Sequence, residues 1–360
     1  MIERRRIVSH PGVYVKDAIE ELGLTQSEFA LRTGLSIKNV STLVNGESNI
    51  TFDVAIKLSL FFHNTVEGWL NLQTKYDLYQ NQKQREEEYK EDWNIVKIID
   101  KGFASRVLDI DITSDEKESV IDELRKAFNV ATLQSLKHPD MYAFCKTSIN
   151  KDIDEKTIIL RNAWISLAER EARKENCGTF NKDYIVSNTR YLRSLTLKHP
   201  QEFSPLLMDF FKKAGVKFVI LPFLSGSNVS GVTKWNSNDN SVLVAVNDCG
   251  KVADRIWFTI FHELGHAIQN HKRHMTISYK ENQIEDQEEI EANEFAKNAL
   301  LDKESYEQFI QKGDFSLRAI NQFAFEQGVA NFIVIGRLQK EEIIPWSKYQ
   351  NQKLKYTVII

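Results

Sequence analysis

Apolar positions recur at helical spacing over most of the chain. Residues 1 to about 80 show short amphipathic segments separated by glycine and polar turns, and the spacing is mainly helical again from about 93 to 199 and from about 253 to 342. In 114–128, Ser114 stands before two acidic residues and is expected to cap a helix. Helices are therefore predicted to dominate the protein.

Three short segments interrupt this helical pattern. They are rich in β-branched residues and are bounded by Gly, Asn and Ser, which is typical of strands. We expect them to form a small antiparallel sheet, and they span 216–222, 229–235 and 241–247. One sheet among many helices gives an α+β protein that is mostly helical.

A strongly charged run from Gln82 to Asp92 has no periodic apolar face. Such a run is most often a solvated helix or a linker, and we place the first domain boundary there. The resulting division is a first domain over 1–80, a helical linker region over 81–160 and a second domain over 161–360. No chemistry is evident in the middle region.

Composition narrows the class of protein. Of 360 residues, 42% are apolar and 27% are charged, as in soluble globular proteins. No apolar run reaches the roughly 18 to 20 residues that span a bilayer, and the basic start has no apolar stretch behind it, so we expect neither a membrane segment nor a secretory signal. Three widely separated cysteines, Cys145, Cys177 and Cys249, fit ordinary reduced thiols in the cytoplasm.

The segment from Thr25 to Gly46 predicts two short helices joined by a glycine turn. Gln26–Thr33 forms the first helix, Gly34 supplies the turn, and Ser36 caps a second helix over Ile37–Val44. This arrangement defines a helix-turn-helix, whose second helix enters the major groove of DNA. The alternative is a helical bundle that does not bind DNA, since helix pairs joined by a glycine turn also occur in such bundles.

The predicted second helix turns short or amide-bearing side chains outward. Such groups can reach base edges or phosphates, and the capping serine and a glutamine at the start of the preceding helix are also well placed. The candidate DNA contacts are therefore Gln26, Ser36, Lys38, Asn39, Ser41 and Thr42. The balance of eight basic and nine acidic residues over 1–80 argues against strong phosphate binding, although three arginines at 4–6 could grip the backbone as an arm.

The segment from His10 to Tyr79 resembles the HigA-type antitoxins, a branch of the Xre-like repressors. The residues that carry the resemblance are His10-Pro11-Gly12, Leu24-Thr25-Gln26, Asn45-Gly46, Trp69-Leu70-Asn71-Leu72-Gln73 and Tyr76-Asp77. The resemblance implies a homodimer that binds a palindromic double-stranded DNA operator, often at its own promoter, and sometimes a toxin partner. Ile37 stands where members of the branch often have a basic residue, so the operator sequence does not carry over.

The sharpest chemical signal is the H-E-x-x-H sequence from His262 to His266. Two histidines four residues apart lie on one face of a helix, one turn apart, which is the geometry that two imidazoles need to bind one Zn²⁺. Glu263 points about 100° around the helix and is the candidate general base. The string lies within an apolar helical run, which makes a chance match improbable.

A catalytic zinc site also needs a third protein ligand. Position alone leaves the choice open among the acids of the predicted helix 285–301, most of which must be solvated, and two nearby histidines are rivals. The carboxylate candidates are Glu285, Asp286, Glu288, Glu289, Glu291 and Glu294, and the histidines are His271 and His274.

From about Trp164 to Gln339 the chain resembles the ImmA/IrrE-type metallopeptidases. The matching residues are Trp257-Phe258-Thr259, His262-Glu263-Leu264-Gly265-His266, Glu291-Ala292-Asn293, Phe295-Ala296, Gly231 with Trp235 in an expected edge strand, and Gly336-Arg337-Leu338-Gln339. The resemblance implies a zincin-like peptidase domain, with Glu291 as the third zinc ligand and Glu288 as the fallback. Leu301-Asp302 departs from a Met-Pro that is common at this helix end.

These features lead to two competing functional hypotheses. In the first, a DNA-binding regulator carries a zinc endopeptidase that cleaves a regulatory protein or itself, with Zn²⁺ as its cofactor. Val229–Trp235 is the candidate strand for docking an extended substrate, and simple structural pairing of that strand is the alternative. In the second, the zinc-type domain is a non-catalytic sensor or toxin-binding scaffold of an antitoxin. A third hypothesis is an enzyme in which the helix-turn-helix domain serves only as a dimerisation module.

Overall fold

The computed structural model describes residues 8–142, 145–146, 153–269, 275–279 and 287–356. It divides into two compact units, Met1–Glu91 and Asp92–Ile360. The arginines at 4–6 lie outside the described residues. No described helix is long and apolar enough to cross a membrane.

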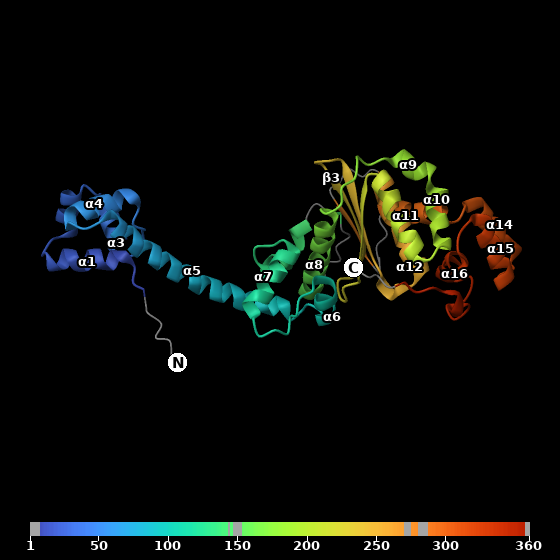
Figure 1. Cartoon of the computed structure of the whole chain (residues 1–360), viewed down its shortest axis with the longest axis horizontal. Helices are drawn as coiled ribbons and strands as arrows, with labels where there is room; N and C mark the ends of the chain where they lie inside the picture. The colour runs from blue at the N-terminus through green and yellow to red at the C-terminus, as the bar shows by residue number, and fades with distance from the viewer. Residues whose placement is uncertain (1–7, 143–144, 147–152, 270–274, 280–286, 357–360) are drawn as a thin grey trace. The chain divides into compact units, whose positions relative to one another are not determined.

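The first unit is a bundle of helices, drawn in blue in Figure 1, where α1, α3, α4 and α5 are labelled. Its helices are α1 (Pro11–Glu21), α2 (Gln26–Thr33), α3 (Ile37–Val44), α4 (Phe52–Phe62) and most of α5 (Val66–Val96). Their apolar faces meet in one core that includes Val15, Phe29, Val40, Leu58 and Trp69. Because each face repeats at helical spacing, the core follows directly from the sequence pattern.

Local capping fixes the two helices of the predicted helix-turn-helix. Thr25 and Glu28 form a reciprocal capping box at the start of α2, and Gly34 ends that helix in the left-handed conformation at φ +68°. The Ser36 side chain accepts a hydrogen bond from the Asn39 N–H at 3.1 Å and begins α3. The helix, glycine turn and helix therefore stand as the sequence predicts.

Helix α5 continues through the charged run and ends in the second unit, at Val96. There, the buried Asp92 carboxylate accepts hydrogen bonds from Arg125 Nε at 2.8 Å and from the Leu133 N–H at 2.9 Å. The residues from 92 to 160 thus belong to the second unit rather than forming a free connection. Their elements are α6 (Lys101–Phe103), the π-helix Ala104–Leu108, α7 (Lys117–Phe128), the 3-10 turns Leu133–Lys137 and Pro139–Tyr142, and β1 (Cys145–Lys146).

The sheet of the second unit is mixed, in the order β1-β5-β3-β4-β2. Its longer strands are β2 (Val216–Leu221), β3 (Val229–Asn236), β4 (Ser241–Asn247) and β5 (Met275–Tyr279). β2 runs parallel to β4, whereas β3 runs antiparallel to both β4 and β5. The three strands found in the sequence are correct, but the expected antiparallel arrangement is wrong. Every residue of β4 is buried, and such a strand takes an internal position with a neighbour on each side, here β3 and β2.

Helices cover both faces of this sheet (Figure 1): α8 (Glu155–Ala172) lies on one face, and α11 (Pro200–Lys213) and α12 (Ala253–Ile268) lie on the other. The remaining helices follow in chain order: α9 (Lys182–Ser187), α10 (Thr189–Ser194), α13 (Gln287–Leu300), α14 (Lys303–Lys312), α15 (Leu317–Gln327) and α16 (Asn331–Lys340). Short 3-10 turns at Leu195–Leu197, Cys249–Lys251 and Gln350–Gln352 complete the described elements.

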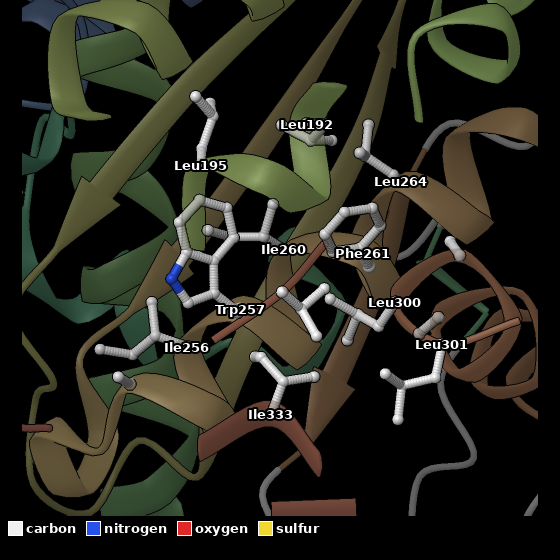
Figure 2. Packing of buried hydrophobic residues seen from close by; sticks show 14 of the residues in the cluster. Leu192, Leu195, Ile256, Trp257, Ile260, Phe261, Leu264, Leu300, Leu301 and Ile333 are labelled. Atoms are coloured by element: carbon white, nitrogen blue, oxygen red, sulfur yellow. The ribbon is translucent and has the colours of Figure 1, made fainter. Parts of the chain in front are cut away.

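Helix α12 lies in the middle of the large hydrophobic core of this unit. Figure 2 shows Trp257, Ile260, Phe261 and Leu264 of α12 packed among leucine and isoleucine side chains from other elements. All four side chains are at most 1% exposed. A helix held on so many sides keeps a fixed rotation, and this fixes where its polar residues point.

Candidate metal centre and DNA-reading helix

His262 and His266 project from the same face of α12 toward one point. Their Nε2 atoms are 3.1 Å apart, and the two rings stand almost perpendicular to each other, at 88°. Both side chains are buried, at 6% and 2% exposure. Two unprotonated imidazole nitrogens that face each other in an apolar core repel unless a cation or a proton lies between them. The arrangement therefore favours a bound cation or proton at this point.

Glu289 of α13 supplies the third group. One carboxylate oxygen lies 3.3 Å from His266 Nε2, and the other lies 3.4 Å from His262 Nε2. His262, His266 and Glu289 can therefore act together as metal ligands. Among the described residues, one potential ligand atom from each of the three lies within 4.8 Å of the other two. Glu289 is 7% exposed, so its carboxylate is not a surface charge.

The expectation of Glu291 as the third ligand is corrected by this geometry. Glu291 is exposed, and its carboxylate accepts a hydrogen bond from Gln287 at 2.8 Å. Two residues along a helix correspond to about 200° of rotation, so Glu289 and Glu291 cannot face the same histidines. Glu288, the fallback, is only partly buried and lies outside the cluster, and the exposed Glu294 pairs with Lys297 at 2.9 Å. The remaining candidates lie outside the described residues: Glu285, Asp286, His271 and His274.

Two small residues let α13 approach α12 closely enough for this contact. A Cβ atom built on Gly265 would lie 2.9 Å from the Ala292 Cα, which is closer than real Cβ contacts allow. Gly265 therefore works here by its lack of a side chain, since it allows the two backbones to come together. Ala292 is adjacent in sequence to Asn293, and Asn293 lies on the same face of α13 as Glu289, four residues earlier.

Asn293 sets the orientation of His262. Its Oδ1 atom lies 3.0 Å from His262 Nδ1, and an amide oxygen only accepts, so this ring nitrogen carries the proton. The Nε2 lone pair is then directed at the shared point. Carbonyl and carboxylate partners of this kind fix the tautomer of metal-binding histidines. Ser278 Oγ of β5 lies 3.2 Å from the same Nε2.

Glu263 is enclosed beside the histidines. The Thr233 hydroxyl lies 2.6 Å from Glu263 Oε2, whereas Oε1 is buried without a hydrogen bond among the described atoms. Gly231 of β3 makes room for this side chain, because a Cβ there would lie 2.3 Å from Oε1. Complete burial raises the pKa of Glu263 above that of an exposed glutamate, although the nearby histidines oppose the shift. A raised pKa favours proton uptake, which is what a general base requires.

The His266 imidazole and the Glu289 carboxylate of the metal centre shift each other's pKa values toward their charged forms. Burial alone would raise the pKa of Glu289, but its contacts with the imidazoles of His262 and His266 outweigh burial and lower the pKa to about 2. Burial disfavours the charged form of His266, yet the Glu289 carboxylate more than compensates, and the pKa of His266 is raised. A carboxylate and two imidazoles are thus held together at a buried point where a positive charge is favoured.

The donor set fits a zinc ion. Ligand bonds of 2.0–2.2 Å in tetrahedral geometry separate neighbouring ligand atoms by roughly 3.2–3.6 Å. The two Nε2 atoms are 3.1 Å apart, and each lies 3.3–3.4 Å from a different oxygen of the Glu289 carboxylate, which is close to that spacing. Two histidines and one glutamate are a known zinc donor set that leaves the fourth position open. His266 Nδ1 is buried without a hydrogen bond, so the outer shell is less complete at His266 than at His262.

Four of the six predicted DNA contacts, Gln26, Ser36, Lys38 and Asn39, are exposed in the first unit. Gln26 is the exposed first residue of α2, and Lys38 and Asn39 are exposed on α3. Ser41 and Thr42 are partly buried. The Ser36 hydroxyl is used as the cap of α3, and the Thr42 hydroxyl bonds to Lys38 O at 3.1 Å and to Ser48 Oγ at 3.0 Å. Lys38, Asn39 and Gln26 are therefore the side chains freest to reach DNA.

Sequence reasoning missed several residues at the metal centre. Thr233 and Ser278 lie on strands that frame the site, and β5 itself was not predicted, although the alternation in Met275–Tyr279 is typical of a strand. Nothing in the sequence distinguished Glu289 from the other five acidic candidates near α13. Asn293 belongs to the Glu291-Ala292-Asn293 sequence that matches the metallopeptidase family. Its spacing of four residues from Glu289 could have indicated that the two side chains share a helix face.

A helix-turn-helix unit and an H-E-x-x-H site with a glutamate from a following helix define a regulator fused to a metallopeptidase-type domain. Family models agree: residues 15–69 match the helix-turn-helix family, and residues 211–326 match the M78 peptidase family, described as an IrrE N-terminal-like domain. The chain belongs to the HigA/Xre-type helix-turn-helix proteins through its N-terminal unit and carries the IrrE-like domain behind it. The resemblances found in the sequence are confirmed.

The similar curated proteins match the N-terminal unit. Antitoxin HigA-1 of Vibrio cholerae is 37% identical over 87 residues, which is 24% of this chain and 82% of that protein. Virulence-associated protein A' of Dichelobacter nodosus is 37% identical over 79 residues, 22% of this chain and 69% of that protein. Among solved structures, an antitoxin HigA from Pseudomonas aeruginosa with its promoter is 29% identical, covers 22% of this chain and 94% of its own, and gives a TM-score of 0.21.

Proposed function

We propose that this protein is a DNA-binding transcriptional regulator of the antitoxin type whose second unit is a zinc-dependent endopeptidase that cleaves a regulatory protein or the chain itself. The observation that carries the enzymatic part is the convergence of His262, His266 and Glu289 beside the buried Glu263. The observation that carries the regulatory part is the capped helix pair with Lys38 and Asn39 exposed.

His262, His266 and Glu289 would hold the metal, and Asn293 would keep His262 in the correct tautomer. When bound, Zn²⁺ supplies Lewis acidity toward a peptide carbonyl and lowers the pKa of a water molecule. Glu263 takes a proton from the attacking water at Oε1, the oxygen left without a hydrogen bond, and delivers it to the leaving amide nitrogen. Thr233 holds the other oxygen and keeps the carboxylate in place.

Strand addition of an extended substrate at β3 is not supported by the sheet. β3 is paired on both sides, with β4 and β5, and therefore is not the edge strand expected from the sequence.

Incubation of the purified full chain with zinc, alone and with the proteins encoded by adjacent genes, tests the enzymatic proposal. We expect cleavage that a chelator stops and that Glu263→Gln abolishes while metal binding persists. Equal behaviour of wild type and Glu263→Gln in cells, together with no cleavage in any mixture, would refute it.

One observation favours a second function, a non-catalytic sensor or toxin-binding scaffold. His262, Glu263, His266 and Glu289 are each at most 7% exposed, so a substrate reaches them only if neighbouring structure moves. In this case Glu263→Gln leaves repression and toxin neutralisation intact, whereas substitution of Glu289 alters them through loss of the metal.

For the DNA-binding part, we propose a homodimer on a palindromic operator, with α3 in the major groove and Gln26, Ser36, Lys38, Asn39, Ser41 and Thr42 along the contact surface. A mobility shift with the protein's own promoter tests this. Failure to shift that DNA at low salt would leave the first unit as a dimerisation module only.

A further inference from the structure

A second site lies in the part of the chain that showed no chemistry in the sequence. A cavity of about 680 Å³ opens beside the C-terminal end of α5, in the region where α6, α7 and α8 appear in Figure 1. Its lining comes from segments far apart in the sequence, the latest being Ser225 in the connection between β2 and β3. All of these residues belong to the second unit. The volume is in the range of small-molecule sites.

The lining carries an excess of positive charge. Four lysines and two aspartates face the cavity, which leaves two net positive charges, and the lysines are Lys97, Lys101, Lys117 and Lys156. None of these lysines forms an ion pair with a described carboxylate, whereas Asp100 is engaged as the cap of α6 and accepts the Phe103 N–H at 2.7 Å. Lys97 contacts Asn94 Oδ1 at 3.4 Å, and the charges of Lys101 and Lys156 act on Asp111 and Asp154. Lysine binds phosphate as a compact point charge.

The start of α7 forms part of the cavity lining through Ser114, Asp115 and Lys117. The helix begins at Lys117 after Glu116 and has no side-chain cap, so Ser114 is not the helix cap expected from the sequence. The Ser114 hydroxyl accepts a hydrogen bond from the Glu116 N–H at 3.2 Å, and the Lys117 N–H bonds to Asp115 O at 3.0 Å.

The floor of the cavity is apolar and one wall is aromatic. Val96, Ile99 and Ile112 are buried beneath it, and Trp93 is half-buried in its lining. The Lys117 ammonium lies 5.2 Å from the centre of the Trp93 ring. Lys117 lies over one face of the Trp93 ring, and the combination of this ring with several lysines suits a ligand that joins an aromatic ring to an anionic group.

From this arrangement we propose that the cavity binds a nucleoside phosphate, with the phosphates among Lys97, Lys117 and Lys156 and the base against Trp93. The inference is independent of the peptidase and DNA-binding proposals, because it uses none of their residues. It gives the 92–160 region a role as a ligand-binding element.

Calorimetric titration of the full chain with ATP, adenosine and inorganic tripolyphosphate tests the proposal and separates its two parts. We expect saturable binding of ATP and at least tenfold weaker binding of each of the other two. Tripolyphosphate that binds as tightly as ATP would overturn the role of Trp93, and adenosine that binds as tightly would overturn the role of the lysines. No saturable binding of any of the three would overturn the site.

Two sets of variants locate the binding. The triple substitution Lys97→Gln, Lys117→Gln and Lys156→Gln should weaken ATP binding at least tenfold, while Lys303→Gln with Lys312→Gln, exposed lysines of α14, should leave it unchanged. All five side chains are exposed, so the variants should fold, which a thermal melt verifies. Equal ATP affinity in the triple variant and in wild type would place any binding elsewhere.

Discussion

Gly265 and Ala292 bring the two helices of the metal centre together, since a Cβ atom on Gly265 would lie only 2.9 Å from the Ala292 Cα. Gly265 lies between the histidine-bearing turns of α12, and Ala292 lies between Glu289 and Asn293 on α13. The spacing between these helices therefore decides whether the carboxylate reaches the two imidazoles.

Gly265→Ala should lower zinc affinity without unfolding the protein. The added methyl group must push α13 away, and a shift of a few tenths of an ångström spoils the ligand distances. Competition against a chromophoric chelator measures the affinity. Gly178→Ala is the control, because nothing lies within 4 Å of its added Cβ and its φ is not positive. Equal zinc affinity in both variants would contradict the close-approach role.

Glu289→Gln and Glu291→Gln separate the ligand from its neighbour. Loss of the Glu289 carboxylate should weaken zinc binding by more than the ~10–100-fold that loss of an outer-shell partner costs. Glu291→Gln should bind zinc as the wild type does, because its side chain is exposed. Metal content after dialysis against a weak chelator distinguishes the two. The reverse pattern would restore Glu291 as the ligand.

Asn293→Ala should weaken zinc binding by about 10–100-fold, since His262 loses the partner that fixes its tautomer. Asn293→Asp keeps an acceptor at the same place and should retain most of the affinity. Asn298→Ala, an exposed position on the same helix, is the matched control. If Asn293→Ala and Asn298→Ala bind zinc equally well, the orienting role of Asn293 is wrong.

Asp92→Ala should destabilise the second unit by roughly 3–5 kcal/mol, because it leaves Arg125 without its buried carboxylate partner. Asp122 contacts the same arginine at 3.7 Å but is 45% exposed, so Asp122→Ala should change stability little. Chemical denaturation, followed by fluorescence of the tryptophans, gives both values. Similar stability for the two variants would mean that the region after Asp92 is loosely attached.

Lys38→Gln should weaken operator binding and reduce the slope of log affinity against log salt by about one, the effect expected for one lost phosphate contact. Lys57 of α4 pairs with Asp53 at 2.8 Å, and Lys57→Gln serves as the control. Fluorescence anisotropy at several salt concentrations measures the slope. An unchanged slope in Lys38→Gln would remove this lysine from the DNA surface.

Much of this protein is determined by local sequence. Capping residues such as Thr25 and Ser36, the Gly34 turn and the apolar spacing of α2 and α3 specify the helix-turn-helix, because all of these interactions join residues close together in the chain. The pairing of His262 with His266 is local for the same reason, since one helical turn joins them.

Tertiary structure alone decided which carboxylate completes the site and how the strands are ordered. Six acids stood near the start of α13, and only the packing of Ala292 on Gly265 sets the rotation that turns Glu289 inward and Glu291 outward. Likewise, alternation within a strand does not reveal its neighbours, so the central position of β3 appeared only when β5, from beyond α12, paired with it. Contacts between segments distant in the chain depend on the packing of the whole core, which no short pattern encodes.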